Sequence, residues 1–225
     1  MSAFRVIIAN KKGGVGKTTY TWLISVCLAR DLDLVVLCVD TDINQLDLGR
    51  LMLDVDTTDK IKIGEIYHSR YEGIDYVALE KIQDIGEMKV KDNYDVIMVD
   101  THPNVYSPVV VEEGDFLIVP LEGSSSIENA KELITEDLKK RAQKILCVLN
   151  KTTQSQKVGV KEIRLARNIG VELYPYPVRF VSLMRRAILE KRPVWEFDKR
   201  TSIYDVILDI AVMISMNTGK EIKCQ

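Results

Sequence analysis

A glycine-rich stretch near the start of the chain, Lys12 to Thr19, constrains the fold more than any other feature of the sequence. It follows the apolar run Phe4 to Ala9, which predicts a buried strand. It precedes Tyr20 to Ala29, which predicts a helix because it contains neither Pro nor Gly. Strand, glycine-rich turn and helix in this order indicate an α/β protein whose loop cradles a phosphate group.

The residue types in this loop suit a triphosphate. Gly13, Gly14 and Gly16 allow backbone conformations that turn successive N–H groups inward, and the helix N-terminus adds further donors. Lys17 would reach the β- and γ-phosphates, and the Thr18 hydroxyl would bind Mg²⁺. We therefore predict a nucleotide site formed by Lys12, Gly13, Gly14, Val15, Gly16, Lys17, Thr18 and Thr19.

The composition is that of an ordinary globular protein, with 46% hydrophobic and 28% charged residues. The formal net charge of -2 does not indicate a nucleic-acid binder, so any such binding needs a local basic patch. The four cysteines form no CxxC pair, which fits a reducing cytosol better than a metal centre. Without a signal peptide or a membrane-spanning run, we expect a single cytoplasmic domain over residues 1–225, with no membrane insertion.

Further apolar runs alternate with helical segments along the chain. Strands are predicted over 34–39, 73–79, 95–99, 116–119, 145–149 and 171–176, and helices over 80–90, 124–141, 158–168, 182–190 and 202–216. Strands that are apolar throughout are typical of a parallel sheet covered on both faces. The predicted fold class is therefore α/β, with a doubly wound, mostly parallel sheet and helices on both faces, of the P-loop NTPase type.

Polar residues follow the predicted strands at the edge where such sheets bind ligands. They are Asn10 to Thr18, Asp40 and Asp42, Asp100 and Thr101, Glu122, and Asn150. Because the carboxyl ends of parallel strands meet at one edge, we expect these groups to share a crevice. Asp100 closes an apolar strand as a magnesium-binding aspartate does, although an acid can also simply end a strand.

The loop departs from the ordinary P-loop at one place. Lys11 stands where Gly is usual, and the stretch reads Lys-Gly-Gly-x-x-Lys-Thr with the additional lysine Lys12. This resembles the deviant Walker A motif of the ParA/MinD ATPase family. The resemblance implies that ATP is held between two subunits and that Lys12 contacts phosphate across the dimer interface.

Two further segments resemble the same family. Tyr94 to Thr101 is similar to its second motif, with His102 where Pro is common, and His102 is either a general base or a bystander. Asp40-Thr41-Asp42 resembles its switch I segment, although the Pro and Gln that usually follow are replaced. By resemblance, Asp42 positions the attacking water and Asp40 supports the metal shell, so Lys12, Lys17 and Asp42 are the expected catalytic residues. The metal residues are Thr18, Asp40 and Asp100.

Asn150 follows the strand predicted over 145–149, and by resemblance the family places an Asn that contacts adenine at this point. The sequence from Asn150 to Thr153 lacks the Asp by which Ras-type GTPases select guanine, which favours ATP. The Pro175 to Val178 loop would close the base pocket, so Pro175 and Pro177 join the predicted nucleotide residues.

The segment 179–200 carries seven basic and three acidic residues on an otherwise acidic chain. A local basic patch is typical of contact with phosphate backbones, although a charged helix face can also be simply solvated. The resemblance implies binding of non-specific DNA by the ATP-bound dimer. The expected DNA-binding residues are Arg185, Arg186, Lys191, Arg192 and Arg200.

These features favour a short ParA-type ATPase that hydrolyses ATP slowly, dimerises around ATP with Mg²⁺ and partitions DNA. Its implied partners are a second copy of the chain, DNA and a ParB-like protein that stimulates hydrolysis. A MinD-like membrane-associated ATPase is the alternative, although the polar face of the last helix carries Asp205 and Asp209 rather than basic residues. A metal-handling relative of the nitrogenase iron protein would require paired cysteines.

Overall fold

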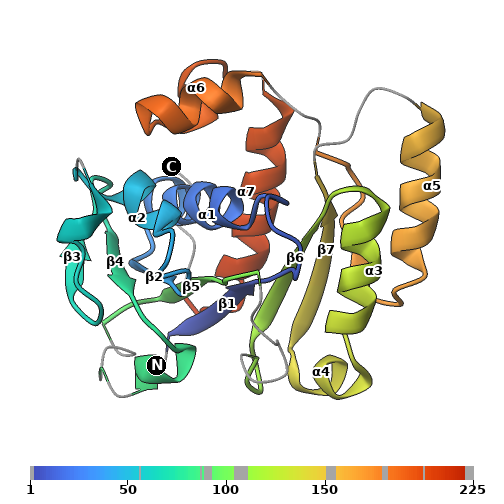
Figure 1. Cartoon of the computed structure of the whole chain (residues 1–225), viewed down its shortest axis with the longest axis horizontal. Coiled ribbons are helices and arrows are strands. Elements are labelled where there is room, and N and C mark those ends of the chain that lie inside the picture. Colours follow the sequence, from blue (N-terminus) through green and yellow to red (C-terminus); the bar gives the residue numbers. More distant parts are fainter. Residues whose placement is uncertain are drawn as a thin grey trace.

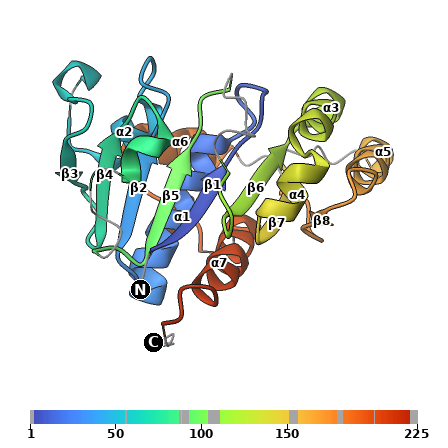
Figure 2. The ribbon, with the colours of Figure 1, turned by 90° about the horizontal axis from the view of Figure 1, so that it is seen from below.

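The computed structural model describes residues 3–55, 57–86, 88, 93–103, 111–150, 156–178, 182–199 and 201–220, with only the backbone described over 156–159. Figures 1 and 2 show a central twisted sheet with helices on both of its faces. The predicted α/β fold class is confirmed.

The described part of the sheet contains eight strands in the order β3-β4-β2-β5-β1-β6-β7-β8. Every neighbouring pair is parallel except β3 and β4, which are antiparallel at one edge. The strands are β1 (Phe4–Ile8), β2 (Val36–Asp40), β3 (Ile66–His68), β4 (Ile74–Ala78), β5 (Val96–Asp100), β6 (Phe116–Leu121), β7 (Lys144–Leu149) and β8 (Glu172–Leu173).

The helices divide between the two faces because successive strand side chains point to opposite sides of the sheet. Ile8 belongs to the core under α1, α2 and α7, whereas Ile7 belongs to the core under α3, α4 and α5. The helices are α1 (Lys17–Leu32), α2 (Asp47–Met52), α3 (Gly123–Leu133), α4 (Glu136–Arg141), α5 (Gln156–Arg167), α6 (Leu183–Glu190) and α7 (Ser202–Ser215), with short 3₁₀ helices η1 (Thr58–Lys60), η2 (Ile82–Gly86) and η4 (Val194–Glu196).

Several elements differ from the sequence-based expectation. The strand predicted over 171–176 is only the two-residue β8. β3 was not predicted, because three residues are too few to show a pattern. The helix predicted over 80–90 is, where described, only the short 3₁₀ helix η2. The helix predicted over 124–141 is two helices, because the Thr135 side chain accepts a 3.2 Å hydrogen bond from the Leu138 N–H and caps a new helix.

The strand predicted over 116–119 continues through Pro120. β6 runs to Leu121, whereas its pairing register with β1 ends at Ile118. Pro120 therefore lies beyond that register, where its missing N–H removes no bond to β1.

The last helix, α7, belongs to the core. α7 lies beside α1, and Ile207 and Ile210 are buried against it. Among the described residues, no helix combines the length and the apolar character that crossing a bilayer requires.

Candidate nucleotide-binding site

The glycine-rich loop follows β1 and leads into α1, as predicted. Gly14 and Gly16 have φ angles of 73° and 101°, in the left-handed region that favours glycine. A Cβ atom on Gly16 would lie only 2.6 Å from Nδ2 of Asn150. Gly16 is also the N-cap of α1 and provides no side-chain cap, so the first N–H groups of this helix are available to an anion.

Lys17 begins α1 and lies under the loop. Its side chain is largely buried, and Nζ donates a 3.3 Å hydrogen bond to the carbonyl oxygen of Lys12. Burial lowers the pKa of Lys17, whereas the nearby Asp100 and Asp42 raise it. A poorly hydrated ammonium group in this position would gain strongly from an anionic ligand.

Lys12 is positioned by two contacts. Its N–H donates to Oδ1 of Asn10 over 2.9 Å, and its Nζ donates to the carbonyl oxygen of Glu122 over 2.9 Å. The ammonium group is thus held at the end of β6 within its own subunit. A role across a dimer interface would require it to exchange this carbonyl for a phosphate.

The side chains of Thr18 and Asp100, the two predicted magnesium ligands, are in direct contact. The Thr18 hydroxyl donates to Oδ2 of Asp100 over 2.6 Å, while Oδ1 of Asp100 is buried without a hydrogen bond to any described residue. Burial raises the pKa of Asp100, and the neighbouring Asp40 raises it further. An unpartnered buried carboxylate oxygen beside a hydroxyl fits Mg²⁺, which takes few protein ligands and prefers oxygen.

Asp40 is the register partner of Asp100 on the adjacent strand, and it is fully buried. Both of its oxygens already accept hydrogen bonds, from the Asp42 N–H at 2.9 Å and from the Tyr76 hydroxyl at 3.3 Å. Burial raises the pKa of Asp40 to about 7. The geometry therefore gives Asp40 a supporting position behind Asp100 rather than an open coordination position.

Asp42 lies beside His102. The two side chains are 3.8 Å apart, measured from Oδ1 of Asp42 to Nε2 of His102. This Asp42 oxygen is buried and has no hydrogen bond to a described residue. The structure thus brings together the two groups that the sequence proposed for water activation.

Asn150 also lies at this edge, because β7 ends beside β6. Its Nδ2 donates to the carbonyl oxygen of Val15 over 2.7 Å, which joins the end of β7 to the glycine-rich loop. The Pro175 to Val178 loop is attached nearby, since the Val178 N–H donates to the carbonyl oxygen of Leu149 over 2.8 Å. Pro175 and Pro177 therefore lie just before a residue, Val178, that is hydrogen-bonded to the end of β7.

A cavity of about 450 Å³ opens at the loop. It is lined by glycines of the loop, by Lys17, Thr18 and Asp42, and also by Met184, Arg185 and Ile188 of α6. Nothing in the amino-acid sequence indicated that these three α6 residues belong to the site. No local pattern could have shown it, because α6 reaches the loop only through the return of the chain over α1 and α2 (Figure 1).

The described members of the predicted DNA-binding set differ in their contacts. Arg186 pairs with Glu190 at 2.7 Å and Arg192 with Glu196 at 3.0 Å, and both guanidinium groups lie over the Phe197 ring. Lys191 donates to backbone carbonyls, Arg185 lines the nucleotide cavity, and Arg200 lies outside the described residues.

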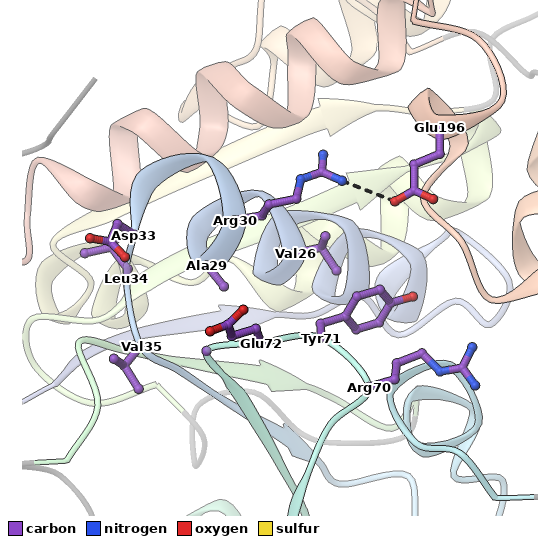
Figure 3. Close-up of a pocket in the computed structure, with 11 residues that line it drawn as sticks. Val26, Ala29, Arg30, Asp33, Leu34, Val35, Arg70, Tyr71, Glu72 and Glu196 are labelled. Atoms are coloured by element: carbon purple, nitrogen blue, oxygen red, sulfur yellow. Dashed lines mark hydrogen bonds and ion pairs between the residues drawn. The ribbon is translucent and has the colours of Figure 1, made fainter. Parts of the chain in front are cut away.

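A larger cavity, of about 570 Å³, lies at the far end of α1 (Figure 3). It is lined by the last turns of α1, the turn between β3 and β4, and η4, where Arg30 pairs with Glu196 at 3.2 Å. None of the predicted nucleotide residues lines it.

The fold and the loop define a P-loop nucleotide-binding protein of the doubly wound α/β class. The family model "CobQ/CobB/MinD/ParA nucleotide binding domain" matches residues 6–194. The chain therefore belongs to this family, that of the ParA and MinD ATPases, and the predicted family membership is confirmed.

The chain is similar both to a Soj protein and to MinD proteins. The sporulation initiation inhibitor protein Soj of Bacillus subtilis is 24% identical over 94% of this chain and 98% of its own length. The cell division ATPase MinD of Pyrococcus furiosus has a TM-score of 0.76 at 19% identity, covering 95% of this chain and 99% of its own. MinD of Pyrococcus horikoshii, complexed with Mg-ADP, has a TM-score of 0.73 at 19% identity, covering 96% and 98%.

Proposed function

We propose that this chain is a ParA-type molecular switch that binds ATP with Mg²⁺, dimerises around it and hydrolyses it slowly. The observation that carries the proposal is the Thr18–Asp100 pair, with its unpartnered buried oxygen, beside Lys17 and the uncapped start of α1. Both the charges and the donors needed by a triphosphate are present in one cavity. The MinD structure with Mg-ADP supports the choice of ligand.

The roles of the side chains follow from their positions. Lys17 and the loop N–H groups would bind phosphate oxygens, and Thr18 and Asp100 would hold Mg²⁺, with Asp40 keeping Asp100 in place. Mg²⁺ would supply neutralisation of charge on the β- and γ-phosphates. Asn150, Pro175 and Pro177 would bound the adenine pocket, since Asn150 already joins β7 to the loop.

Hydrolysis would depend on positioning rather than on covalent chemistry. Asp42 would orient the attacking water, because it lines the same cavity as Lys17 and Thr18 and its Oδ1 has no hydrogen bond to a described residue. Turnover would be slow, because the carboxylate of Asp42 alone would orient the water. A ParB-like partner would stimulate the reaction.

Dimerisation would change the partner of Lys12. Its Nζ is only half-buried on the carbonyl oxygen of Glu122, a neutral acceptor that an anionic phosphate of the facing subunit would readily replace. ATP would thereby join two copies of the chain, and hydrolysis would separate them.

DNA is the cargo that we propose, with a revised contact surface. Arg186 and Arg192 are neutralised by Glu190 and Glu196. On the outer helix α5, in contrast, Lys161, Arg164 and Arg167 are exposed and form no ion pair with a described residue. These three cations would contact phosphate backbones without reading sequence.

The test is DNA binding in the presence of ATP, ADP or no nucleotide, with anionic liposomes as a parallel surface. We expect ATP-dependent binding to DNA of any sequence that weakens steeply with salt, as in a nucleoid-associated cytoplasmic protein. Lys17→Ala should bind neither ATP nor DNA. ATP-dependent binding to liposomes but not to DNA would instead support the MinD-like alternative, which the structural similarity to MinD keeps open.

A further inference from the structure

The α6 helix forms part of the nucleotide cavity, although its sequence suggested a DNA-binding surface. Met184, Arg185 and Ile188 line the cavity together with Lys17, Thr18 and Asp42. The described base-side residue Asn150 does not line it. Since Lys17 serves the β- and γ-phosphates and Asp42 serves the attacking water, α6 lies at the terminal-phosphate end of the site.

A set of contacts at its C-terminal end holds α6 in this position. Lys191 caps the helix with a φ of 50°, and its carbonyl oxygen accepts a 2.7 Å hydrogen bond from the Tyr71 hydroxyl. The Lys191 Nζ donates to the carbonyl oxygens of Leu53 and Val55, at 3.2 and 3.4 Å, in the segment that follows α2. The Tyr71 oxygen in turn accepts from Nε1 of Trp22 on α1 at 3.0 Å.

These contacts connect α6 to the body of the protein through side chains that are themselves fixed. Trp22 is fully buried, and Figure 3 shows the Tyr71 ring lying beside α1. Within α6 itself, Ala187 is fully buried and faces the core. The helix is thus anchored with the residues 184, 185 and 188 facing the loop, so that this face has a defined position before any ligand binds.

Arg185 is the cation that this arrangement leaves available. Its neighbour Arg186 is ion-paired with Glu190, and Lys191 donates to backbone carbonyls. Arg185 is exposed and, within the described part of the chain, forms no ion pair. A guanidinium group matches the geometry of a phosphate and can bind two of its oxygens at once.

We propose that Arg185 binds the terminal phosphate of the nucleotide within its own subunit and so distinguishes ATP from ADP. This inference rests on the proposed function, because it requires a triphosphate in the cavity. ADP would leave Arg185 in solvent, whereas the terminal phosphate of ATP would bind its guanidinium group on the anchored helix α6. Arg185 is then a nucleotide-sensing residue and not one of the DNA contacts that the basic segment 179–200 suggested.

The test compares two adjacent arginines. Arg185→Ala should weaken binding of the slowly hydrolysed analogue ATPγS about tenfold, which corresponds to about 1.4 kcal/mol, while ADP binding changes less than twofold. Arg186→Ala, in which the altered residue is ion-paired on the same helix, should leave both affinities unchanged. Titration calorimetry with Mg²⁺, at concentrations where light scattering reports a monomer, measures both ligands.

Arg185→Lys should restore part of the preference for ATPγS, because it restores the charge but not the two-pronged geometry. Equal losses for ATPγS and ADP, no loss in Arg185→Ala, or the same loss in Arg186→Ala would each overturn the inference. If Arg185→Ala is unstable by thermal melting, Arg185→Gln gives the same comparison with a side chain of similar length. Failure of the unaltered protein to bind either nucleotide would overturn the proposed function itself, and this inference with it.

Discussion

The Thr18 hydroxyl donates a 2.6 Å hydrogen bond to Oδ2 of Asp100, which joins the start of α1 to the end of β5 across 82 residues of sequence. The other Asp100 oxygen stays buried without a described partner, and Asp40 lies in register beside it. Two neighbouring buried carboxylates repel each other when both are ionised. Lys17 offsets this repulsion only in part, since the pKa of Asp100 is still raised, and a bound Mg²⁺ would offset more of it.

Asp100→Asn should stabilise the protein without ligands while weakening its binding of nucleotide. Burial and repulsion by Asp40 both disfavour the charged form of Asp100 and raise its pKa. An amide cannot ionise, so neither cost remains in the variant. We expect the melting temperature without Mg²⁺ to rise by about 2–4 °C, as for a gain of roughly 1 kcal/mol in a chain of this length. Mg²⁺ should then no longer strengthen ADP binding. A lower melting temperature together with an unchanged response to Mg²⁺ would contradict this assignment.

Lys12→Ala should bind ATP but remain monomeric. In the structure its Nζ contacts only a carbonyl oxygen of its own chain among the described contacts, so its removal leaves the loop and Lys17 in place. Light scattering with ATP and Mg²⁺ measures the mass. Lys11→Ala is the matched control, since Lys11 pairs at the surface with Glu132 and should still dimerise. Normal dimerisation of the Lys12 variant would remove the proposed contact between subunits.

Asp42→Ala should bind nucleotide and dimerise, yet turn over at least about 100-fold more slowly, because the attacking water loses its orienting carboxylate. Phosphate release under saturating ATP measures the rate. His102→Ala separates the two candidates, which lie 3.8 Å apart. If the histidine variant loses the activity and the aspartate variant keeps it, His102 is the residue that activates water.

The DNA surface is tested by reversing charge on one helix at a time. Arg164→Glu with Arg167→Glu should remove ATP-dependent DNA binding and preserve dimerisation, because both side chains are exposed on α5. Arg186→Glu with Arg192→Glu should have a smaller effect, since acidic neighbours already neutralise these two groups. Filter binding at two salt concentrations measures both. A larger loss of DNA binding in the Arg186 and Arg192 variant than in the α5 variant would instead support the DNA contacts predicted from the sequence.

The strand, loop and helix that carry the phosphate site could be predicted from the amino-acid sequence, because the required glycines and apolar runs are local in the chain. The sequence also indicates which carboxylates end the strands, and a parallel sheet necessarily brings those ends to one edge. Asp40, Asp42, Asp100 and Asn150 could therefore be assigned to one crevice without coordinates.

The contacts of each charged group, in contrast, became apparent only from the folded structure. The seven basic residues of 179–200 look like one patch in sequence, but Arg186 and Arg192 turn to Glu190 and Glu196, and Arg185 turns to the nucleotide cavity. Net charge along a segment is a property of composition, whereas the pairing of long side chains depends on which elements the folded chain places beside them. Lys191 shows the reason, because its hydrogen bonds to Leu53, Val55 and Tyr71 cross more than one hundred residues.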